Sequence, residues 1–101
     1  MNLPVVFKPA ALSELEEAVA WYEAECPGLG QEFKLEVKRT LQRALANAEH
    51  FQRIRGRAQR IRLRRFKKYA IYFALKEGTF AVLAIFHGSR NPAELRRRRL
   101  P

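Results

Sequence analysis

Halfway along the chain, the spacing of apolar residues changes from a helical period to the alternation of a strand. This change limits the possible folds more than any other feature. In the first half, two amphipathic segments are separated by Pro27-Gly28, a pair of residues that ends helices. Because the connection between the two segments is so short, we expect an antiparallel helical hairpin.

The first predicted helix begins at Pro9, where the missing N–H of proline costs nothing, directly after a short strand over Pro4–Lys8. Its predicted buried face consists of Leu12, Leu15, Val19 and Tyr22, widened by Ala18 and Trp21. The buried face of the second helix is Phe33, Val37, Leu41, Ala44, Leu45 and Ala48. Neither helix is apolar all round, so the pair must cover another layer of structure.

The second half of the chain supplies that layer. Residues 49–59 are expected to form a loop that turns at Gly56. Residues 60–65 then alternate basic and apolar side chains, which predicts a strand with Ile61 and Leu63 facing inward and arginines facing solvent.

Two further strands are predicted. Apolar residues alternate over 69–75 after a tight connection at 66–68, and Glu77-Gly78 forms a turn. Residues 79–87 are almost continuously apolar, which is typical of a strand in the interior of a sheet. Asn91–Glu94 has the residues of a helix cap and indicates a short terminal helix.

The predicted order is therefore β-α-α-β-β-β, with a further α at the end. Strands grouped after a helical hairpin indicate an α+β fold, a mostly antiparallel sheet with the hairpin packed on one face. We expect the remote first strand to join this sheet. At 101 residues the chain is predicted to be one domain, 1–101, with a basic tail over 91–101.

Charge is distributed very unevenly. The chain has 20 Lys and Arg against 10 acidic residues, a net charge of +10. Residues 1–50 hold eight glutamates and five basic residues, a net −3, whereas residues 51–101 hold two glutamates and fifteen basic residues, a net +13. Such asymmetry points to a nucleic acid, an acidic protein or another anionic surface as partner.

The sequence argues against a metalloprotein, a membrane-spanning protein and a secreted protein. Cys26 is the only cysteine, and His50 and His87 show no metal-ligand spacing, so we expect no metal and no cofactor. The longest uncharged stretch, residues 78–89, is far shorter than the roughly 20 residues of a membrane-spanning helix. No secretory signal is apparent, so we expect a cytoplasmic protein without membrane contact.

The candidate target- or nucleic-acid-binding residues are Arg53, Arg55, Arg57, Arg60, Arg62, Arg64, Arg65, Lys67, Lys68 and Arg90. Apart from Arg90, they form a run without a single acid, which favours a functional surface over a merely solvated face. The cluster Arg96–Arg99 is either a solvated end or a further contact with the target. Trp21 and Tyr22 are interpreted as packing residues, and Cys26 as part of a helix end.

Taken in order along the chain, these residues resemble the RelE/ParE superfamily of bacterial toxins. The residues that are similar to the opening strand and helical hairpin of the family are Phe7, Pro9, Ala11, Leu15, Trp21-Tyr22, Pro27, Leu29 and Phe33. Arg65-Phe66 with Tyr69, Ile71 and Tyr72 is similar to the central hairpin of the family. Val82-Leu83, Ile85, His87, Arg90 and Pro92 are similar to its last strand and exit.

The resemblance implies the toxin of a type II toxin–antitoxin pair, bound by an antitoxin in a hetero-oligomer. Two branches are possible: ParE-like toxins inhibit DNA gyrase, and RelE-like toxins cleave mRNA on the ribosome. For the second branch, the catalytic candidates are His87 as base, with Arg65 and Arg90 holding phosphate. His87 is alternatively a strand-end histidine hydrogen-bonded to its neighbours.

The chemistry of the basic region favours the ParE-like branch. Cleaving RNA through its 2′-OH needs groups that take and give protons, and arginine stays protonated at any working pH. The ribonuclease members that the chain resembles often carry a tyrosine or a histidine near the C-terminus, and after Arg90 this chain has neither. We therefore expect a non-enzymatic gyrase inhibitor. A third hypothesis, a non-toxin nucleic-acid-binding module, rests on aromatic residues such as Phe66, Tyr69 and Tyr72 among arginines.

Overall fold

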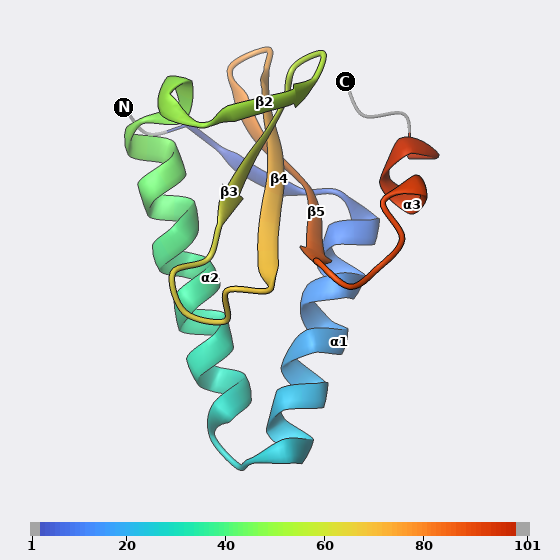
Figure 1. The fold of residues 1–101 in the computed structure, drawn as a ribbon. Helices are drawn as coiled ribbons and strands as arrows, with labels where there is room; N and C mark the ends of the chain where they lie inside the picture. Colours follow the sequence, from blue (N-terminus) through green and yellow to red (C-terminus); the bar gives the residue numbers. More distant parts are fainter. Residues whose placement is uncertain (1–2, 99–101) are drawn as a thin grey trace.

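The computed structural model of the protein describes residues 3–98 apart from the side chain of Arg55. Its elements are β1 (Val5–Phe7), α1 (Pro9–Glu25), α2 (Leu29–Ala46), a short 3-10 helix η1 (Ala48–His50), β2 (Gln52–Arg55), β3 (Ala58–Arg62), β4 (Tyr69–Lys76), β5 (Thr79–His87) and α3 (Ala93–Arg96). The strands form one sheet in the order β1-β5-β4-β3-β2 (Figure 1). β1 is parallel to β5, and every other pair in this sheet is antiparallel. The predicted α+β fold is confirmed.

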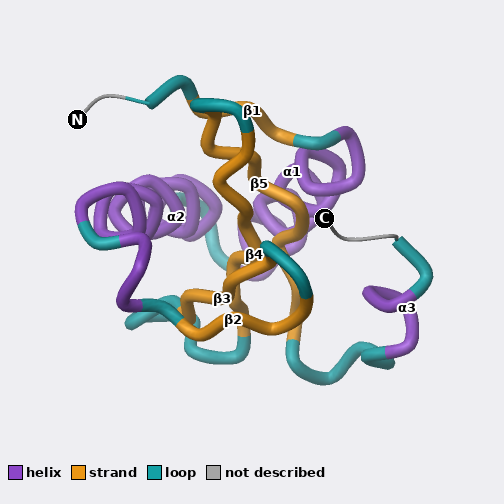
Figure 2. The backbone as a smooth tube through the Cα atoms, turned by 90° about the horizontal axis from the view of Figure 1, so that it is seen from above, coloured by secondary structure: helices purple, strands orange, loops and turns teal. Residues whose placement is uncertain are grey.

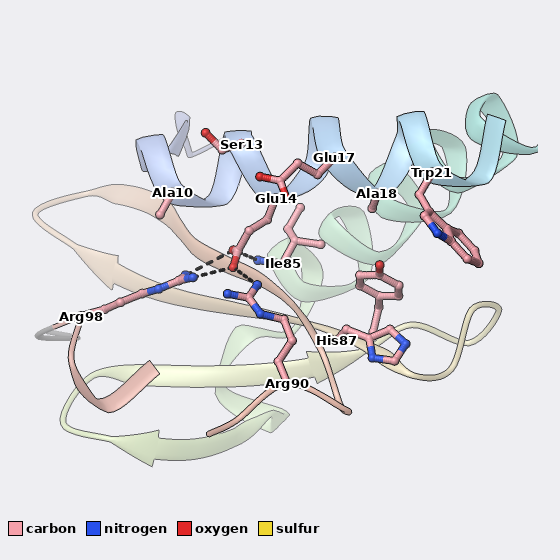
Figure 3. A pocket seen from close by; sticks show the side chains of 11 residues that line it. Ala10, Ser13, Glu14, Glu17, Ala18, Trp21, Ile85, His87, Arg90 and Arg98 are labelled. Atoms are coloured by element: carbon pink, nitrogen blue, oxygen red, sulfur yellow. Dashed lines mark hydrogen bonds and ion pairs between the residues drawn. The ribbon is translucent and has the colours of Figure 1, made fainter. Parts of the chain in front are cut away.

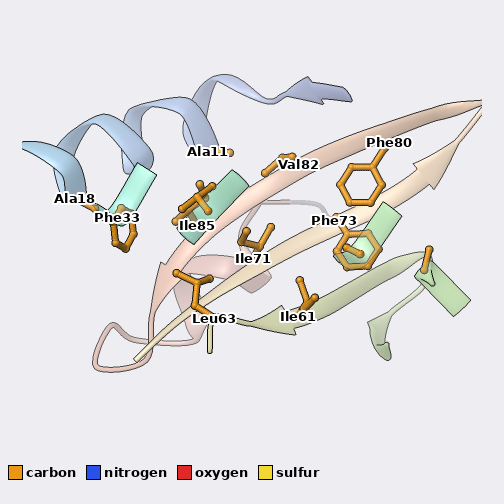
Figure 4. Packing of buried hydrophobic residues seen from close by; sticks show 13 residues of the cluster. Ala11, Ala18, Phe33, Ile61, Leu63, Ile71, Phe73, Phe80, Val82 and Ile85 are labelled. Carbon is orange, nitrogen blue, oxygen red and sulfur yellow. The ribbon is translucent and has the colours of Figure 1, made fainter. Parts of the chain in front are cut away.

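The helical hairpin covers one face of the sheet. Gly28 makes the sharp connection between α1 and α2 with a φ of 92°, a left-handed conformation that glycine adopts without strain. Phe33 of α2 and Ala18 of α1 join Ile71 of β4 and Ile85 of β5 in one buried cluster (Figure 4). The predicted packing of the hairpin on one face is therefore confirmed.

The opposite face of the sheet has its own, smaller apolar cluster. Ala70 and Tyr72 of β4 pack there with Phe86 of β5 and Leu95 of α3. Seen from above, the strands lie between α2 and α3 (Figure 2). Both faces of β5 are therefore covered, which explains its unbroken apolar sequence and confirms its predicted interior position between β1 and β4.

An irregularity in β5 determines which way its backbone groups point. Tyr72 pairs with Ala84 but Phe73 pairs with Val82, so Leu83 is an extra residue on β5, a β-bulge. Before the bulge, the carbonyl of Val82 accepts a hydrogen bond from Lys8 N (2.9 Å), at the end of β1. After the bulge, the residues of β5 whose backbone groups point toward the β1 side are the odd-numbered ones rather than the even-numbered ones.

Several details of the sequence prediction are wrong, and one of them is that the strand expected over 60–65 is β3, Ala58–Arg62. Residues 49–59 are not a plain loop: they contain η1 and the strand β2, which pairs with β3 around the predicted turn at Gly56. The predicted face of α1 is also rotated, because Leu12 is 45% exposed whereas Ala11 is fully buried. α1 lies so close to β5 that alanines occupy the contact and larger side chains lie beside it.

Candidate functional site

A cavity of about 570 Å³ lies between α1, the end of β5 and the segment that follows it (Figure 3). Its lining residues are Ala10, Ser13, Glu14, Glu17, Ala18, Trp21, Tyr69, Ile85, His87, Arg90 and Arg98. Two of the three predicted catalytic candidates, His87 and Arg90, are therefore in its wall. The small side chains of α1 in its wall leave room for the cavity, and charged side chains surround it.

Glu14 is the central polar residue of this cavity. Its carboxylate is almost fully buried and accepts hydrogen bonds from the backbone N–H of Ile85 (2.9 Å), from Arg90 Nη1 (2.5 Å) and from Arg98 Nη2 (2.5 Å). β1 pairs with β5 only as far as Val82, so α1 rather than a strand faces Ile85. The carboxylate of Glu14 thus accepts the backbone hydrogen bond that a neighbouring strand would otherwise accept. It also links α1, β5 and the C-terminal segment.

Arg90 is held on both sides. Besides Glu14, it contacts Glu94 through Nη2 (2.5 Å), and its guanidinium lies 4.4 Å from the ring centroid of Phe86. Burial acts to lower the pKa of Arg90, but the hydrogen bonds to Glu94 and Glu14 outweigh it and raise the pKa. Arg90 is therefore a cation that the fold already neutralises.

His87 uses one ring nitrogen for a local hydrogen bond. Its Nδ1 accepts the backbone N–H of Ser89 (3.0 Å), and the ring packs edge-to-face against Tyr69 with centroids 4.9 Å apart. A nitrogen that accepts an N–H carries the lone pair, so the proton of the neutral ring is on Nε2. In this arrangement His87 offers the cavity a hydrogen-bond donor, while its basic nitrogen is occupied.

Arg65 lies outside this cavity, in the loop between β3 and β4. Its side chain forms an ion pair with Glu32, and its backbone N–H donates to Glu36 Oε2 (2.7 Å). Arg65 is thus bound to α2, whereas Arg90 is bound to α1 through Glu14. The two arginines that the sequence suggested as phosphate ligands share no partner.

The other candidate basic residues lie along the β2–β3 hairpin and the β3–β4 loop. Arg53, Arg57, Arg62, Arg64, Lys67 and Lys68 are exposed. Arg60 is half-buried and donates to Gln52 Oε1 (2.7 Å). The side chain of Arg55 and the whole of Arg99 lie outside the described residues.

Two residues of this cavity, Glu14 and Trp21, were not recognised as site residues from the sequence. Glu14 is not part of the predicted buried face, but it lies on one stripe with Ala11 and Ala18, the other two buried residues of α1. That stripe was the available signal. Trp21 was interpreted as a packing residue and is 59% exposed at the cavity, while Tyr22 packs on Phe33 as predicted.

The C-terminal basic cluster also has a structural role that its composition did not reveal. Arg98 is held on Glu14, whereas Arg96 and Arg97 are exposed. Within residues 3–98, no three histidine, cysteine or acidic side chains are arranged to hold a metal ion. No helix in the same range is long and apolar enough to cross a membrane.

One comparison with known proteins identifies a family, and another identifies a shared fold. The family model described as the ParE toxin of the type II toxin–antitoxin system parDE matches residues 5–92. A solved structure described as the chromosomal ParDE TA system from P. aeruginosa has the same fold, with a TM-score of 0.72 at 12% identity, over 84% of this chain and 95% of that chain. No curated protein matches the chain. Because the family model covers most of its length, the protein belongs to the ParE toxin family of type II toxin–antitoxin systems.

Proposed function

We propose that this toxin inhibits DNA gyrase through protein contacts on the gyrase–DNA complex, in the cytoplasm, and that a cognate antitoxin neutralises it in a hetero-oligomer. Membership of the ParE toxin family carries this proposal. The P. aeruginosa structure with the same fold belongs to a ParDE system, which supports an antitoxin as the partner. The basic residues of the β2–β3 hairpin and the β3–β4 loop are proposed as the surface that meets the target.

The geometry of the nuclease candidates supports a binding toxin over an enzyme. RNA cleavage through the 2′-OH needs a free base and a cation available to the phosphate. The basic nitrogen of His87 accepts from Ser89, and Arg90 is already paired with two glutamates. Each group would have to give up an internal partner before it could act on RNA.

A ribosome-dependent mRNA endonuclease remains the second candidate. It is favoured by one observation, namely that His87 and Arg90 line the same cavity as the exposed ring of Trp21. In that case His87 would act as the base after exchanging its hydrogen bond to Ser89. The two functions predict different targets and different effects of changing His87.

The purified toxin is therefore tested separately on gyrase supercoiling and on translating ribosomes with labelled mRNA. We expect inhibited supercoiling and intact mRNA, and we expect His87→Ala to keep most of the inhibition. His50→Ala, which changes an exposed histidine of η1, is the matched control. Cleaved mRNA with unaffected gyrase would overturn the proposal, and a loss of cleavage of about 100-fold or more in His87→Ala would identify the base.

A further inference from the structure

A second cavity, of about 350 Å³, lies where the β3–β4 loop meets the end of β5. It is lined by Arg62, Lys67, Lys68, Gly88 and Ser89. Among the described residues, none of its three cations has an ion-pair partner, in contrast to Arg65, Arg90 and Arg98. The fold therefore brings three unneutralised positive charges to one concave site.

The backbone beneath these cations is firmly held. Phe66, directly before Lys67, has a φ of 61°, which is unusual for a bulky residue and costs free energy. Its ring is packed against Tyr22 and Phe33, with centroid distances of 4.8 and 5.1 Å. On the other side, Gly88 N donates to the carbonyl of Lys68 (2.7 Å). The backbone of the cavity is thus preformed.

Arg43 of α2 adds a further positive charge next to the backbone of Arg62. The guanidinium of Arg43 donates to the carbonyl of Arg62 (3.3 Å), and its pKa is lowered by burial and then by the charge of Arg64. Arg62, Lys67 and Lys68 carry like charges around one cavity, and these charges repel one another in the free protein. An anion that enters the cavity relieves this repulsion and gains binding free energy.

We propose that this cavity binds one phosphate group of a nucleic-acid strand. A guanidinium fork and two ammonium groups suit a group with several acceptor oxygens better than a carboxylate with two. The hydroxyl of Ser89 lies 2.7 Å from His87 Nδ1, so the three cations supply the donors of the site. The exposed Arg53 and Arg57 extend the basic surface along which further phosphates can lie. The inference rests on the proposed target-facing role of this basic surface, and it defines what that surface recognises.

The test uses the purified toxin and a fluorescein-labelled 12-nucleotide single-stranded DNA, with binding measured by fluorescence anisotropy. The pocket variant is the triple change Arg62→Gln, Lys67→Gln and Lys68→Gln. The matched control, with Lys34→Gln, Lys38→Gln and Arg39→Gln, removes the same charge from exposed positions of α2. We expect the Kd of the pocket variant to rise about 10-fold or more and that of the control to rise only a few-fold. Circular dichroism confirms that both variants are folded.

Salt dependence and competition identify the ligand chemistry. Loss of one phosphate contact should reduce the slope of log K against log salt by about 0.7 in the pocket variant and leave the control unchanged. Inorganic phosphate should displace the DNA from the wild type at a lower ionic strength than sodium chloride does. Equal weakening of both variants, or displacement by polyglutamate but not by phosphate, would overturn the proposal. DNA binding through the pocket without inhibition of gyrase would leave the phosphate site intact and contradict only the proposed target.

Discussion

At the scale of single residues, Glu14 determines how the first cavity is built. One carboxylate accepts hydrogen bonds from a backbone N–H and two guanidiniums, which come from residues 71 to 84 positions further along the chain. Burying a carboxylate is unfavourable unless it is paired and hydrogen-bonded, and here both conditions are met. Its removal therefore leaves unsatisfied groups on three separate segments.

We expect Glu14→Gln to lower the free energy of unfolding by about 2–3 kcal/mol, because two charged hydrogen bonds lose their anion. Urea unfolding followed by circular dichroism measures the change. Glu17→Gln is the control, since Glu17 is exposed on the same helix and its change should stay within about 0.5 kcal/mol. Equal effects of the two changes would show that the contacts of Glu14 contribute little to stability.

The residue scale is also where the sequence was least informative. Every glutamate of the first helix has the same chemistry, and only the close approach of α1 to β5 makes Glu14 different from Glu17. In the same way, the occupied nitrogen of His87 depends on the turn that brings the N–H of Ser89 back to the ring. Such contacts arise from tertiary structure and leave no periodic signal.

At the scale of secondary-structure elements, periodicity was a good guide where one face alone is buried. Phe33 and Val37 of α2 are buried as predicted, and so are Ile61 and Leu63. The strand β2 was not predicted within residues 49–59, because arginines and a glycine dominate this segment. Pairing with β3 is enough to form the strand. The bulge at Leu83 was invisible because every residue around it is apolar.

The β4–β5 hairpin gives a prediction at this scale. Glu77 and Gly78 form its two-residue turn with φ values of 52° and 73°, and the flanking Lys76 and Thr79 pair with each other. Turns with two positive φ values favour Asn-Gly, whereas glutamate is strained there. We expect Glu77→Asn to raise the free energy of unfolding by roughly 0.5–1 kcal/mol.

Chemical denaturation of the wild type, Glu77→Asn and Glu77→Gln provides the measurement. Glutamine removes the same charge but keeps the conformational preference of glutamate, so its effect should be close to zero. Stabilisation by both changes would assign the gain to the lost charge and contradict the explanation from the turn.

At the scale of the whole molecule, the two unequal halves of the charge pattern are joined by ion pairs. Glu14 and Glu32 of the acidic helical hairpin pair with Arg90, Arg98 and Arg65 of the basic half. These contacts pair part of the excess positive charge of the second half within the fold. The exposed residues of the β2–β3 hairpin and the β3–β4 loop, among them Arg62, Lys67 and Lys68, provide the part that remains for a partner.

This excess predicts how stability responds to salt. The molecule measures 38 × 32 × 21 Å and carries a net charge of +10, so in about 10 mM salt, where screening extends over roughly 30 Å, most of its charges repel one another. In about 150 mM sodium chloride the range falls to roughly 8 Å. The buried pairs of Glu14 are screened far less, so the loss of repulsion should dominate.

We therefore expect the Tm to rise by about 4 °C between these two salt concentrations, which corresponds to about 1 kcal/mol for a domain of this size. Differential scanning calorimetry measures the change. The double variant Arg53→Gln and Arg57→Gln removes two exposed charges from the basic surface and should show a smaller rise. A Tm that falls as salt is added would mean that ion pairs between the two halves outweigh the repulsion within the basic half.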